Sequence, residues 1–537
     1  MAKKRSGQTA LISVYDKRGI GDFVRKLHRL GFKIFASGGT AKEIAKSGVK
    51  VTDVAELVGG GAILGHRVVT LSREIHAGLL ADYKRDKKEM VELAIPYIDL
   101  VCVDLYPLEE EISKLDATRE SVIEKTDIGG PAMLRSAAKG RRIVICDPYD
   151  REKVIKWIRD GKPAESEFIG NLVAKAETLC GKYALSSARY HSNGQIDFMS
   201  GSFQMECKYG ENGWQTPATL FSRETGDPLA LSCFELIAGE EPSYNNLCDL
   251  DRLLQTLTHI AAGFDLNGFV TPKIAVGVKH GNPCGAAVAR NAQNAVKKMI
   301  LGDPLAIFGG LVAVNFEVDE KIAETLLTHG EKTGRRLLDG IIAPSFTKKA
   351  IEMLSRKKDK CRFLANPNLS RLKRDSLDCG LRFRFVRGGF LRQPNYNFVF
   401  NFKDKELKTY GRLKKEQKRD LLLAWAVGST SNSNTITLVL DGALLGNGVG
   451  QQDRVGGAQL AVMRAVRSGH EIEGAVAYSD SFFPFTDGVE VLSNAGVKVI
   501  LATSGSVMDS DVINFCRDRH IKLCLIPDRK GRGFFGH

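Results

Sequence analysis

The chain has 537 residues, 43% of them hydrophobic and 26% charged, which excludes a disordered or fibrous protein and favours two or more domains. Its net charge of +14 is spread along the chain in runs that acidic residues interrupt and that lack interleaved aromatics, so we expect small anionic substrates and no nucleic acid. No apolar run is long enough to span a membrane and the basic N-terminus makes a poor signal peptide, so we expect a cytoplasmic protein with no membrane partner.

The first 150 residues alternate between short apolar strands and helices. A strand over 9–14 (TALISV) precedes apolar residues that recur at helical spacing, and Gly31 ends that helix. A strand over 33–36 (KIFA) leads through SGGT into a second helix, where Thr40 and Glu43 have the spacing of a capping box. Two more buried strands, in PYIDLVCVDLYPL and RRIVICDPYD, complete a parallel, doubly wound α/β domain.

Two glycine-containing turns at helix starts are candidate anion sites. SGGT at 37–40 lies between a strand and a helix, whose N-terminus offers free N–H groups to an anion, but a plain strand-to-helix turn explains it equally well. TDIGGPAMLRSAAKG at 126–140 begins with two glycines ahead of Pro131, between Asp127 and Lys139. Helix capping alone accounts for this second turn.

The composition changes around residues 195–215, which are rich in Gly, Asn and Gln and favour a linker. Beyond them, helices alternate with strands such as KIAVGV, GGLVAVNF, TITLVL, GAVAYS and VKVILAT. We therefore expect one domain over 1–200 and a second over 201–537, the latter built from two similar α/β halves that divide near 395–415.

VKHGNPCG at 278–285 follows an apolar strand, so Lys279 and His280 are expected at a strand end before a proline turn. Two adjacent potential cations repel each other, which favours a neutral imidazole able to accept a proton near neutral pH. Two solvated side chains are the plainer interpretation of this dipeptide. A zinc deaminase is disfavoured because neither H-x-E nor PCxxC is present, and the eleven cysteines lie singly with no CxxC pair, so no metal is expected.

GNGVGQQDRVGG at 446–457 resembles a dinucleotide loop at first sight. It lacks the third glycine of that motif, because Gln451 stands in its place. We expect a glycine-lined turn that presents Gln451 and Arg454 to a ligand.

A series of motifs in constant order resembles the AICAR transformylase/IMP cyclohydrolase family. In chain order they are SGGTA, DLYP, DIGGPAMLRSAAK, KYGEN, SYNNLCDLD, KHGNPCG, DPLAIFGG, DGIIAPSF, SNT, GxGQQDR and SDSFFPF. Each is weak alone, whereas their order over essentially the whole chain is specific. The resemblance implies a methylglyoxal-synthase-like cyclohydrolase domain, then a transformylase of two cytidine-deaminase-like halves without zinc. It also implies a homodimer with transformylase sites at the subunit interface.

The resemblance further implies de novo purine biosynthesis, in which AICAR receives a formyl group from 10-formyltetrahydrofolate, without a metal, and the product FAICAR closes to IMP. His280 would take the proton from the attacking 5-amino group, Lys279 would stabilise the oxyanion, and Asn434 would orient His280. Phe308 and Asp339 match folate-pocket positions, and nucleotide positions are matched by Lys208, Tyr209, Asn246, Gln451, Arg454 and Arg532. Lys208 replaces an arginine, Trp214 a histidine, and Arg532 is displaced by about one position.

The cyclohydrolase half matches the family at catalytic and at substrate-binding positions. The catalytic matches are Tyr106, Asp127 and Lys139, and the binding matches are Ser13, Lys17, Ser37, Gly38, Gly39, Thr40, Arg67 and Thr70. The family's RVKTLHP is RVVTLSR here, so Val69 replaces a lysine, and Tyr15 replaces a small serine. Losing that cation is expected to slow ring closure by about tens- to thousands-fold, unless Arg73 on the same loop substitutes for it.

Two alternatives to a bifunctional enzyme stay open at this point. One is a monofunctional transformylase whose first domain closes the ring poorly. The other is a basic nucleic-acid-binding protein that has lost catalysis, which the retained Lys279, His280 and Asn434 disfavour.

Overall fold

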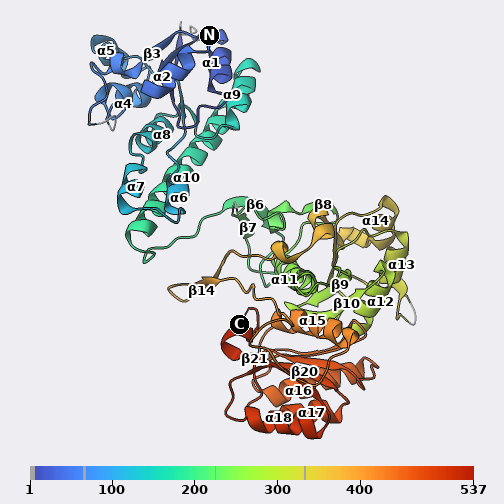
Figure 1. The fold of residues 1–537 in the computed structure, drawn as a ribbon. Helices are drawn as coiled ribbons and strands as arrows, with labels where there is room; N and C mark the ends of the chain where they lie inside the picture. The colour runs from blue at the N-terminus through green and yellow to red at the C-terminus, as the bar shows by residue number, and fades with distance from the viewer. Residues whose placement is uncertain (1–6, 65–67, 224, 332–333, 537) are drawn as a thin grey trace. The chain divides into compact units, whose positions relative to one another are not determined.

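The computed structural model describes residues 7–64, 68–223, 225–331 and 334–536. They form two compact units, Met1–Met199 and Ser200–His537, each with hydrophobic core of its own (Figure 1). Within the described ranges, no helix is both long and apolar enough to cross a membrane.

The first unit is built on a parallel sheet with the strand order β3-β2-β1-β4-β5. The strands are β1 (Gln8–Ser13), β2 (Phe32–Ala36), β3 (Val51–Asp53), β4 (Leu100–Val103) and β5 (Ile143–Ile145). The chain runs outward from β1 in one direction and resumes at β4 on the other side of β1. The carboxyl ends of β1 and β4 therefore flank the topological switch point, where open α/β sheets bind ligands. This is the parallel α/β fold expected from the sequence.

Helices cover both faces of this sheet. They are α1 (Ile20–Arg29), α2 (Gly38–Ala45), α3 (Val54–Leu57), α4 (Arg73–Leu80), α5 (Lys87–Glu92), α6 (Leu108–Ile112), α7 (Arg119–Glu124), α8 (Gly129–Lys139), α9 (Asp150–Arg159) and α10 (Glu165–His191). The predicted helix after β1 is confirmed as α1. The predicted capping box is wrong, because α2 begins at Gly38 and Thr40 lies inside it, where its hydroxyl bonds to the backbone of Val14 instead.

The second unit contains one mixed sheet whose strand order is symmetric about its centre: β16-β21-β20-β19-β17-β18-β10-β9-β11-β12-β13-β8. The two halves meet where β10 and β18 pair, with Ala287 opposite Ala443. The first half has β8 (Glu235–Ala238), β9 (Lys273–Lys279), β10 (Asn282–Ala289), β11 (Leu311–Val314), β12 (Gly340–Ala343) and β13 (Arg362–Ala365). The second has β16 (Lys408–Tyr410), β17 (Ile436–Leu440), β18 (Ala443–Gly448), β19 (Val476–Ser479), β20 (Val499–Ser504) and β21 (Lys522–Pro527).

Two long helices, α11 (Tyr244–Leu266) and α15 (Lys415–Ser429), pack together on one face of this sheet. The other face is covered by α12 (Ala292–Gly302), α13 (Glu320–Thr328), α14 (Lys348–Leu354), α16 (Arg454–Arg467), α17 (Asp487–Asn494) and α18 (Asp509–Asp518), and α19 (Asp528–Gly531) follows β21. Side chains of β9 alternate between the two faces, with Ile274 and Val276 toward α11 and Ala275 toward α12. The halves therefore match element by element.

Two hairpins lie outside the large sheet and were not expected from the sequence. β6 (Ser202–Cys207) pairs with β7 (Ala218–Ser222), so part of the predicted linker is a strand. β14 (Leu381–Val386) pairs with β15 (Gly389–Pro394) in the segment that joins the two halves.

One buried histidine makes the second unit sensitive to acid. His259 on α11 donates from Nδ1 to the carbonyl of Gln255 (2.8 Å) and stacks on Tyr396, while its Nε2 has no hydrogen-bond partner among the described residues. Burial lowers the pKa of His259 from 6.5 to about 4. Below pH 6.5 His259 binds a proton in the unfolded chain, whereas in the folded chain it stays neutral until about pH 4. The free energy of unfolding that this difference contributes is present above pH 6.5 and is lost as the pH falls from 6.5 to about 4.

We expect replacement of His259 by phenylalanine to remove this acid sensitivity and keep the stacking on Tyr396. Between pH 7 and pH 5, the unfolding free energy of the second unit should fall by about 2 kcal/mol less in His259→Phe than in the parent chain. Urea unfolding at the two pH values measures this difference. The exposed His520, changed to asparagine, is the control and should leave the pH dependence as it is; an equal fall in His259→Phe and parent would contradict the assignment.

Candidate active sites of the two units

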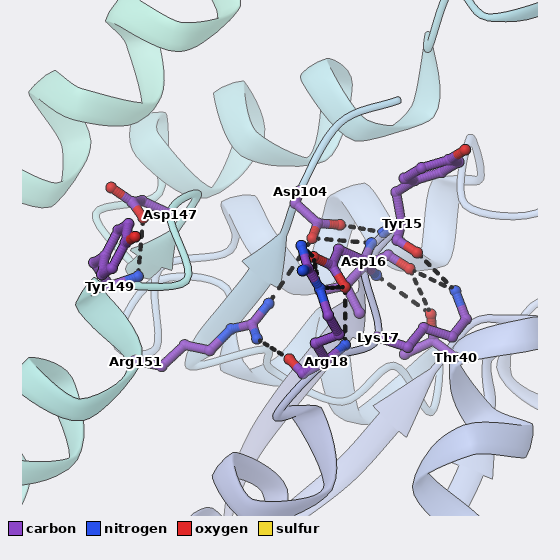
Figure 2. A network of polar contacts seen from close by, with 10 residues as sticks. Tyr15, Asp16, Lys17, Arg18, Thr40, Asp104, Asp147, Tyr149 and Arg151 are labelled. Carbon is purple, nitrogen blue, oxygen red and sulfur yellow. Dashed lines mark hydrogen bonds and ion pairs between the residues drawn. The ribbon is translucent and has the colours of Figure 1, made fainter. Parts of the chain in front are cut away.

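The loop after β1 is fixed at the switch point by a network of polar contacts (Figure 2). Thr40 Oγ1 lies 3.3 Å from the Val14 nitrogen and 3.2 Å from its oxygen, so it holds the loop at its start. The Asp104 carboxylate, just beyond β4, accepts the backbone N–H groups of Tyr15 and Asp16. Arg151 lies 3.9 Å from that carboxylate and also donates to the backbone of the loop. This network holds the loop rigidly at the switch point.

Several of the predicted binding residues gather around this loop. Ser13 Oγ and Ser37 Oγ lie 2.9 Å apart. Lys17 Nζ donates to the carbonyl of Val14 at 2.9 Å, and Lys17 Cε lies 3.7 Å from where a Cβ on Gly39 would stand. A lysine, two hydroxyls and the N-terminus of α2 thus converge, an arrangement suited to a phosphate.

A second group of predicted site residues lies at the start of α8. A Cβ on Gly129 would stand 2.7 Å from Thr70 Oγ1, so only glycine allows this close approach. Asp127 Oδ1 accepts the Gly130 N–H (2.8 Å), and burial raises the pKa of Asp127. Burial and the nearby Asp127 charge raise the pKa of Tyr106.

Tyr106 connects the residues around the loop after β1 with those at the start of α8. Its ring meets the Tyr15 ring edge-on at 5.5 Å between centroids, and Tyr15 belongs to the loop after β1. Lys125 Nζ lies 5.2 Å from the centre of the Tyr15 ring. Tyr15 stands where the family has a small serine, and it joins this group of residues by packing against Tyr106, the tyrosine that we expect to be catalytic.

The remaining four positions that the sequence singled out in the first unit are Arg67, Val69, Arg73 and Lys139. Arg67 lies outside the described residues. Lys139 is exposed at the last residue of α8, whereas Asp127 precedes the first, so the helix separates them by roughly 16 Å. Val69, in place of the family's lysine, packs against the apolar core. Arg73 begins α4 and pairs with Glu74 at 3.2 Å, which gives no support to its replacing the missing lysine.

In the second unit, Lys279 and His280 lie at the tip of the β9–β10 hairpin. His280 and Gly281 form its two-residue turn with φ of +53° and +74°, and Lys279 stands opposite Asn282. The predicted proline turn is wrong, because Pro283 lies within β10. Asp249 Oδ1 on α11 accepts the Gly281 N–H at 2.7 Å, and burial raises the pKa of Asp249. A buried carboxyl group thus positions the turn.

The hairpin tip lies beside the ends of two neighbouring strands. Lys279 Nζ donates to the carbonyl oxygen of Phe308 at 2.6 Å, and the Phe308 side chain is exposed. Asp339 directly precedes β12, where its carboxylate pairs with Arg356 at 2.6 Å. Lys279, Phe308 and Asp339 therefore lie at one end of β9, β11 and β12, with an exposed aromatic ring beside the lysine.

The loop before β17, which belongs to the second half, lies beside the tip of the β9–β10 hairpin. Asn282 Oδ1 accepts the Asn432 N–H at 3.1 Å and so brings the loop to the hairpin. Asn434 Oδ1 accepts from Arg454 Nη2 at 2.9 Å, and within the described ranges its side chain has no hydrogen bond to His280. Arg454 is itself paired with the buried Asp480.

The remaining predicted residues of the second half lie close to these. The backbones of Gln451 and Asn434 bond to each other at 3.0 and 3.2 Å, which places Gln451 in the same loop cluster. Arg532 pairs with Asp528 at 2.5 Å and is half-exposed. Gln451 and Arg454 therefore both lie beside Asn434, and their presentation to a ligand stays a prediction.

Three further predicted nucleotide residues, Lys208, Tyr209 and Asn246, lie before or at the start of α11. Lys208 Nζ pairs with Glu240 (2.8 Å), which also pairs with Arg362 at the start of β13, three strands and roughly 14 Å from β9. The Tyr209 carbonyl accepts the Tyr244 N–H. Asn246 is buried and caps α11, with its Oδ1 accepting from Ser243 N (3.0 Å) and Oγ (2.9 Å). Lys208 thus lies away from Lys279, whereas Asn246 lies one helical turn before Asp249, which bonds the hairpin turn.

Three positioning residues were missed in the sequence, namely Asp249, Asn282 and Asp480. Each lies inside a motif that the sequence had singled out: SYNNLCDLD, KHGNPCG and SDSFFPF. The part of the chain that the structure describes holds no group of three or more His, Cys, Asp or Glu side chains arranged for a metal ion.

A family model described as AICARFT/IMPCHase bienzyme matches residues 137–464, which is more than half of the chain. The chain belongs to this bienzyme family. A second model, the MGS-like domain, matches residues 19–132 of the first unit. The bienzyme is thus a bifunctional enzyme of purine biosynthesis, with AICAR formyltransferase and IMP cyclohydrolase activities. Neither alternative, a monofunctional transformylase or a nucleic-acid-binding protein, gains support.

Full-length relatives agree with this assignment. The bienzyme is 36% identical over 524 residues to "Bifunctional purine biosynthesis protein PurH" of Anoxybacillus flavithermus, covering 96% of this chain and 97% of that protein. It is 34% identical over 531 residues to the protein of the same name from Persephonella marina, with 96% and 98% covered. For that of Acidithiobacillus ferrooxidans the identity is 35% over 542 residues, with 97% and 98% covered.

Proposed function

We propose that the bienzyme transfers the formyl group of 10-formyltetrahydrofolate to AICAR at the β9–β10 hairpin tip, and closes FAICAR to IMP at the carboxyl ends of β1 and β4. The observation that supports the first site best is the tip itself, where Asp249 fixes the turn that displays His280 while Asn282 binds the loop of Asn434. A base, an ammonium group and an amide are thereby held at the ends of rigid strands, as positional catalysis requires.

Formyl transfer at this tip needs one proton acceptor and one oxyanion partner. The 5-amino nitrogen of AICAR attacks the formyl carbon, and His280 takes the proton that the nitrogen loses. Lys279 stabilises the oxyanion of the tetrahedral intermediate. The bond between the formyl carbon and N10 then breaks, and the proton passes to N10, which gives FAICAR and tetrahydrofolate. Phe308 and Asp339 beside Lys279 suit a flat pterin with polar edges.

Ring closure in the first unit needs a general acid–base and a phosphate site. The carboxamide nitrogen of FAICAR attacks the formyl carbon, and the resulting carbinolamine loses water to form IMP. Asp127, whose pKa burial raises, is suited to shuttle these protons, with Tyr106 beside it as hydrogen-bond donor to the formyl oxygen. Lys17, Ser37 and the N-terminus of α2 suit the phosphate. Lys139 has no place in this scheme because of its distance from Asp127.

A homodimer would reconcile the placement of Lys208 and Tyr209 with a role in nucleotide binding. In such a dimer, the segment of one chain that carries Lys208 and Tyr209 would complete the hairpin site of the other chain. We also propose that the reaction needs no metal, because the steps above use only side chains of this chain, and that the enzyme is cytoplasmic, since all eleven cysteines are free thiols.

The test supplies purified full-length enzyme with AICAR plus 10-formyltetrahydrofolate, and separately with FAICAR alone. Formation of FAICAR in the first assay and of IMP in the second is the expected result. IMP formation no faster than the uncatalysed reaction would refute the assignment of ring closure to this chain.

The change Asp127→Asn isolates the ring-closure site. It keeps the oxygen that accepts the Gly130 N–H, so we expect IMP formation to fall by about 10²–10⁴-fold while formyl transfer continues at the parent rate. Steady-state kinetics on both substrates measure the two effects. Asp53→Asn is the matched control, because Asp53 likewise accepts a backbone N–H at a helix start of the same unit. Ring closure at the parent rate in Asp127→Asn would show that Asp127 carries no proton in this reaction.

A further inference from the structure

The two halves of the second unit are equivalent down to individual hydrogen bonds at their hairpin tips. The turn of β17–β18 is Asp441–Gly442, with φ of +50° and +68°, and it matches the His280–Gly281 turn. Asp420 on α15 accepts the Gly442 N–H at 2.7 Å, as Asp249 on α11 does for Gly281. The arrangement that positions the transformylase tip therefore exists twice.

The loops beside the two tips are equivalent as well. Thr435 N donates to Asp480 at 3.1 Å, and Asp480 N returns a bond to the Thr435 carbonyl at 3.3 Å. In the first half, Ile274 N donates to Asn315 at 2.8 Å, and Asn315 N returns a bond to the Ile274 carbonyl at 3.3 Å. The loop over 267–273 is thus the counterpart of the loop that carries Asn434.

A cavity lies at this counterpart loop. Two adjoining hollows of about 560 and 380 Å³ share Phe269, and we call them together the Phe269 pocket. Asn315, the counterpart of Asp480, lines the smaller one. Lys273 and Lys279 lie at opposite ends of β9, so roughly 20 Å separates the pocket from the transformylase tip.

The pocket is strongly basic. The six cations that line it are Lys273, Arg371, Lys373, Arg412, Lys415 and Lys418. Within the described ranges none of the six forms an ion pair, and the single carboxylate of the lining, Asp265, accepts the backbone N–H of Arg374. Three cations line each of the two adjoining hollows, and six cations without a described ion pair favour a ligand with several negative charges.

Aromatic and apolar groups lie among these cations. Phe269 and Phe402 both line the larger hollow, with Lys418 Nζ 5.3 Å from the centre of the Phe402 ring, and Leu372 lines the smaller. The volume is that of a pocket for a small molecule, and the lining offers a ring to stack on beside cations for phosphate. The chemistry suits a flat aromatic ring joined to a phosphate.

We propose that the Phe269 pocket is a second nucleotide site, which binds a purine nucleotide without transforming it. This inference rests on the proposed function, because it takes the counterpart loops of the second half as the nucleotide-binding part of the transformylase site. The counterparts of Lys279 and His280 are Leu440 and Asp441, so the second tip has no imidazole, and the ammonium group of Lys298 beside it is paired with the Asp441 carboxylate at 2.7 Å. The site therefore binds ligand but lacks the groups for the reaction.

Photolabelling of the full-length enzyme with 8-azidoadenosine 5′-monophosphate, followed by peptide mapping, tests the proposal. We expect labelled peptides that contain residues 265–273 or 402–418. The charge-reversing pair Arg371→Glu and Lys373→Glu should lower this labelling at least tenfold and leave formyl transfer unchanged. The pair Lys348→Glu and Lys349→Glu makes the same charge change on α14, and should leave the labelling as it is.

Three results would overturn the proposal. They are labelling confined to other peptides, labelling of the pocket that survives Arg371→Glu with Lys373→Glu, and competition by ribose 5-phosphate as strong as that by AMP, which would leave no role for the base. His280→Ala separates this proposal from the proposed function, since it removes the transformylase base and leaves the pocket intact. Labelling of the pocket in that variant supports the second site whatever the variant does to catalysis.

Discussion

Replacing His280 with alanine should abolish formyl transfer and leave ring closure at the parent rate. The imidazole is the only proton acceptor that we assign at the tip of the β9–β10 hairpin, and loss of a general base costs about 10²–10⁴-fold in rate. Ring closure is assigned to the other compact unit and does not use this side chain. Formation of FAICAR from AICAR and of IMP from FAICAR, measured on one preparation, gives both rates.

The backbone of His280 calls for a control, because its φ of +53° lies in the left-handed region that alanine disfavours. Asp441→Ala places alanine at the equivalent turn position, with φ of +50°, and should leave formyl transfer within about threefold of the parent. His280→Asn adds a residue that tolerates this backbone but cannot act as a base, and it should be as inactive as His280→Ala. Formyl transfer near the parent rate in His280→Asn would contradict the assignment.

The sheets were predictable from the sequence because buried strands leave a strong signal. Apolar runs such as KIAVGV and VKVILAT cannot be solvated, and they became β9 and β20. The turn after β9 was mispredicted because Pro283 is typical of turns. A change of strand register between Pro283 and Gly285 accommodates this proline inside β10, and Gly281 supplies the turn.

Which side chains belong to each site was harder to predict. A side chain such as Thr40 or Asn434 can bond to one of several partners, and some of those partners are distant in sequence. Thr40 has the spacing of a helix cap, but its hydroxyl bonds to the Val14 backbone, which comes close only in the folded sheet. Asn434 appeared free to orient His280, whereas Arg454 takes its oxygen. Asn246 is a further case, because the family resemblance implied a nucleotide contact, whereas in the structure its side chain forms a capping box with Ser243.

Loss of the Arg454 guanidinium should be the largest single destabilisation of the second unit. Arg454 pairs with Asp480, which is fully buried, and also bonds to Ser479 Oγ (3.2 Å) and Asn434 Oδ1 (2.9 Å). In Arg454→Met the Asp480 carboxylate keeps only the Thr435 N–H among its described partners. A buried charge left in this way costs about 3–5 kcal/mol. Urea-dependent hydrogen exchange of peptides from 415–448, with peptides from 1–199 as internal reference, measures the loss.

A second change distinguishes the unpaired charge from lost packing. Asp480→Asn removes the charge but keeps an oxygen for the Thr435 N–H, so adding it to Arg454→Met should restore at least half of the lost stability. Formyl transfer should stay low in the double variant, because the Asn434 amide still lacks the group that orients it. Lys498→Met is the control, since it breaks an exposed pair with Glu473 and should cost less than about 1 kcal/mol. Equal losses in the single and double variants would mean that Arg454 stabilises the unit by packing and not by its charge.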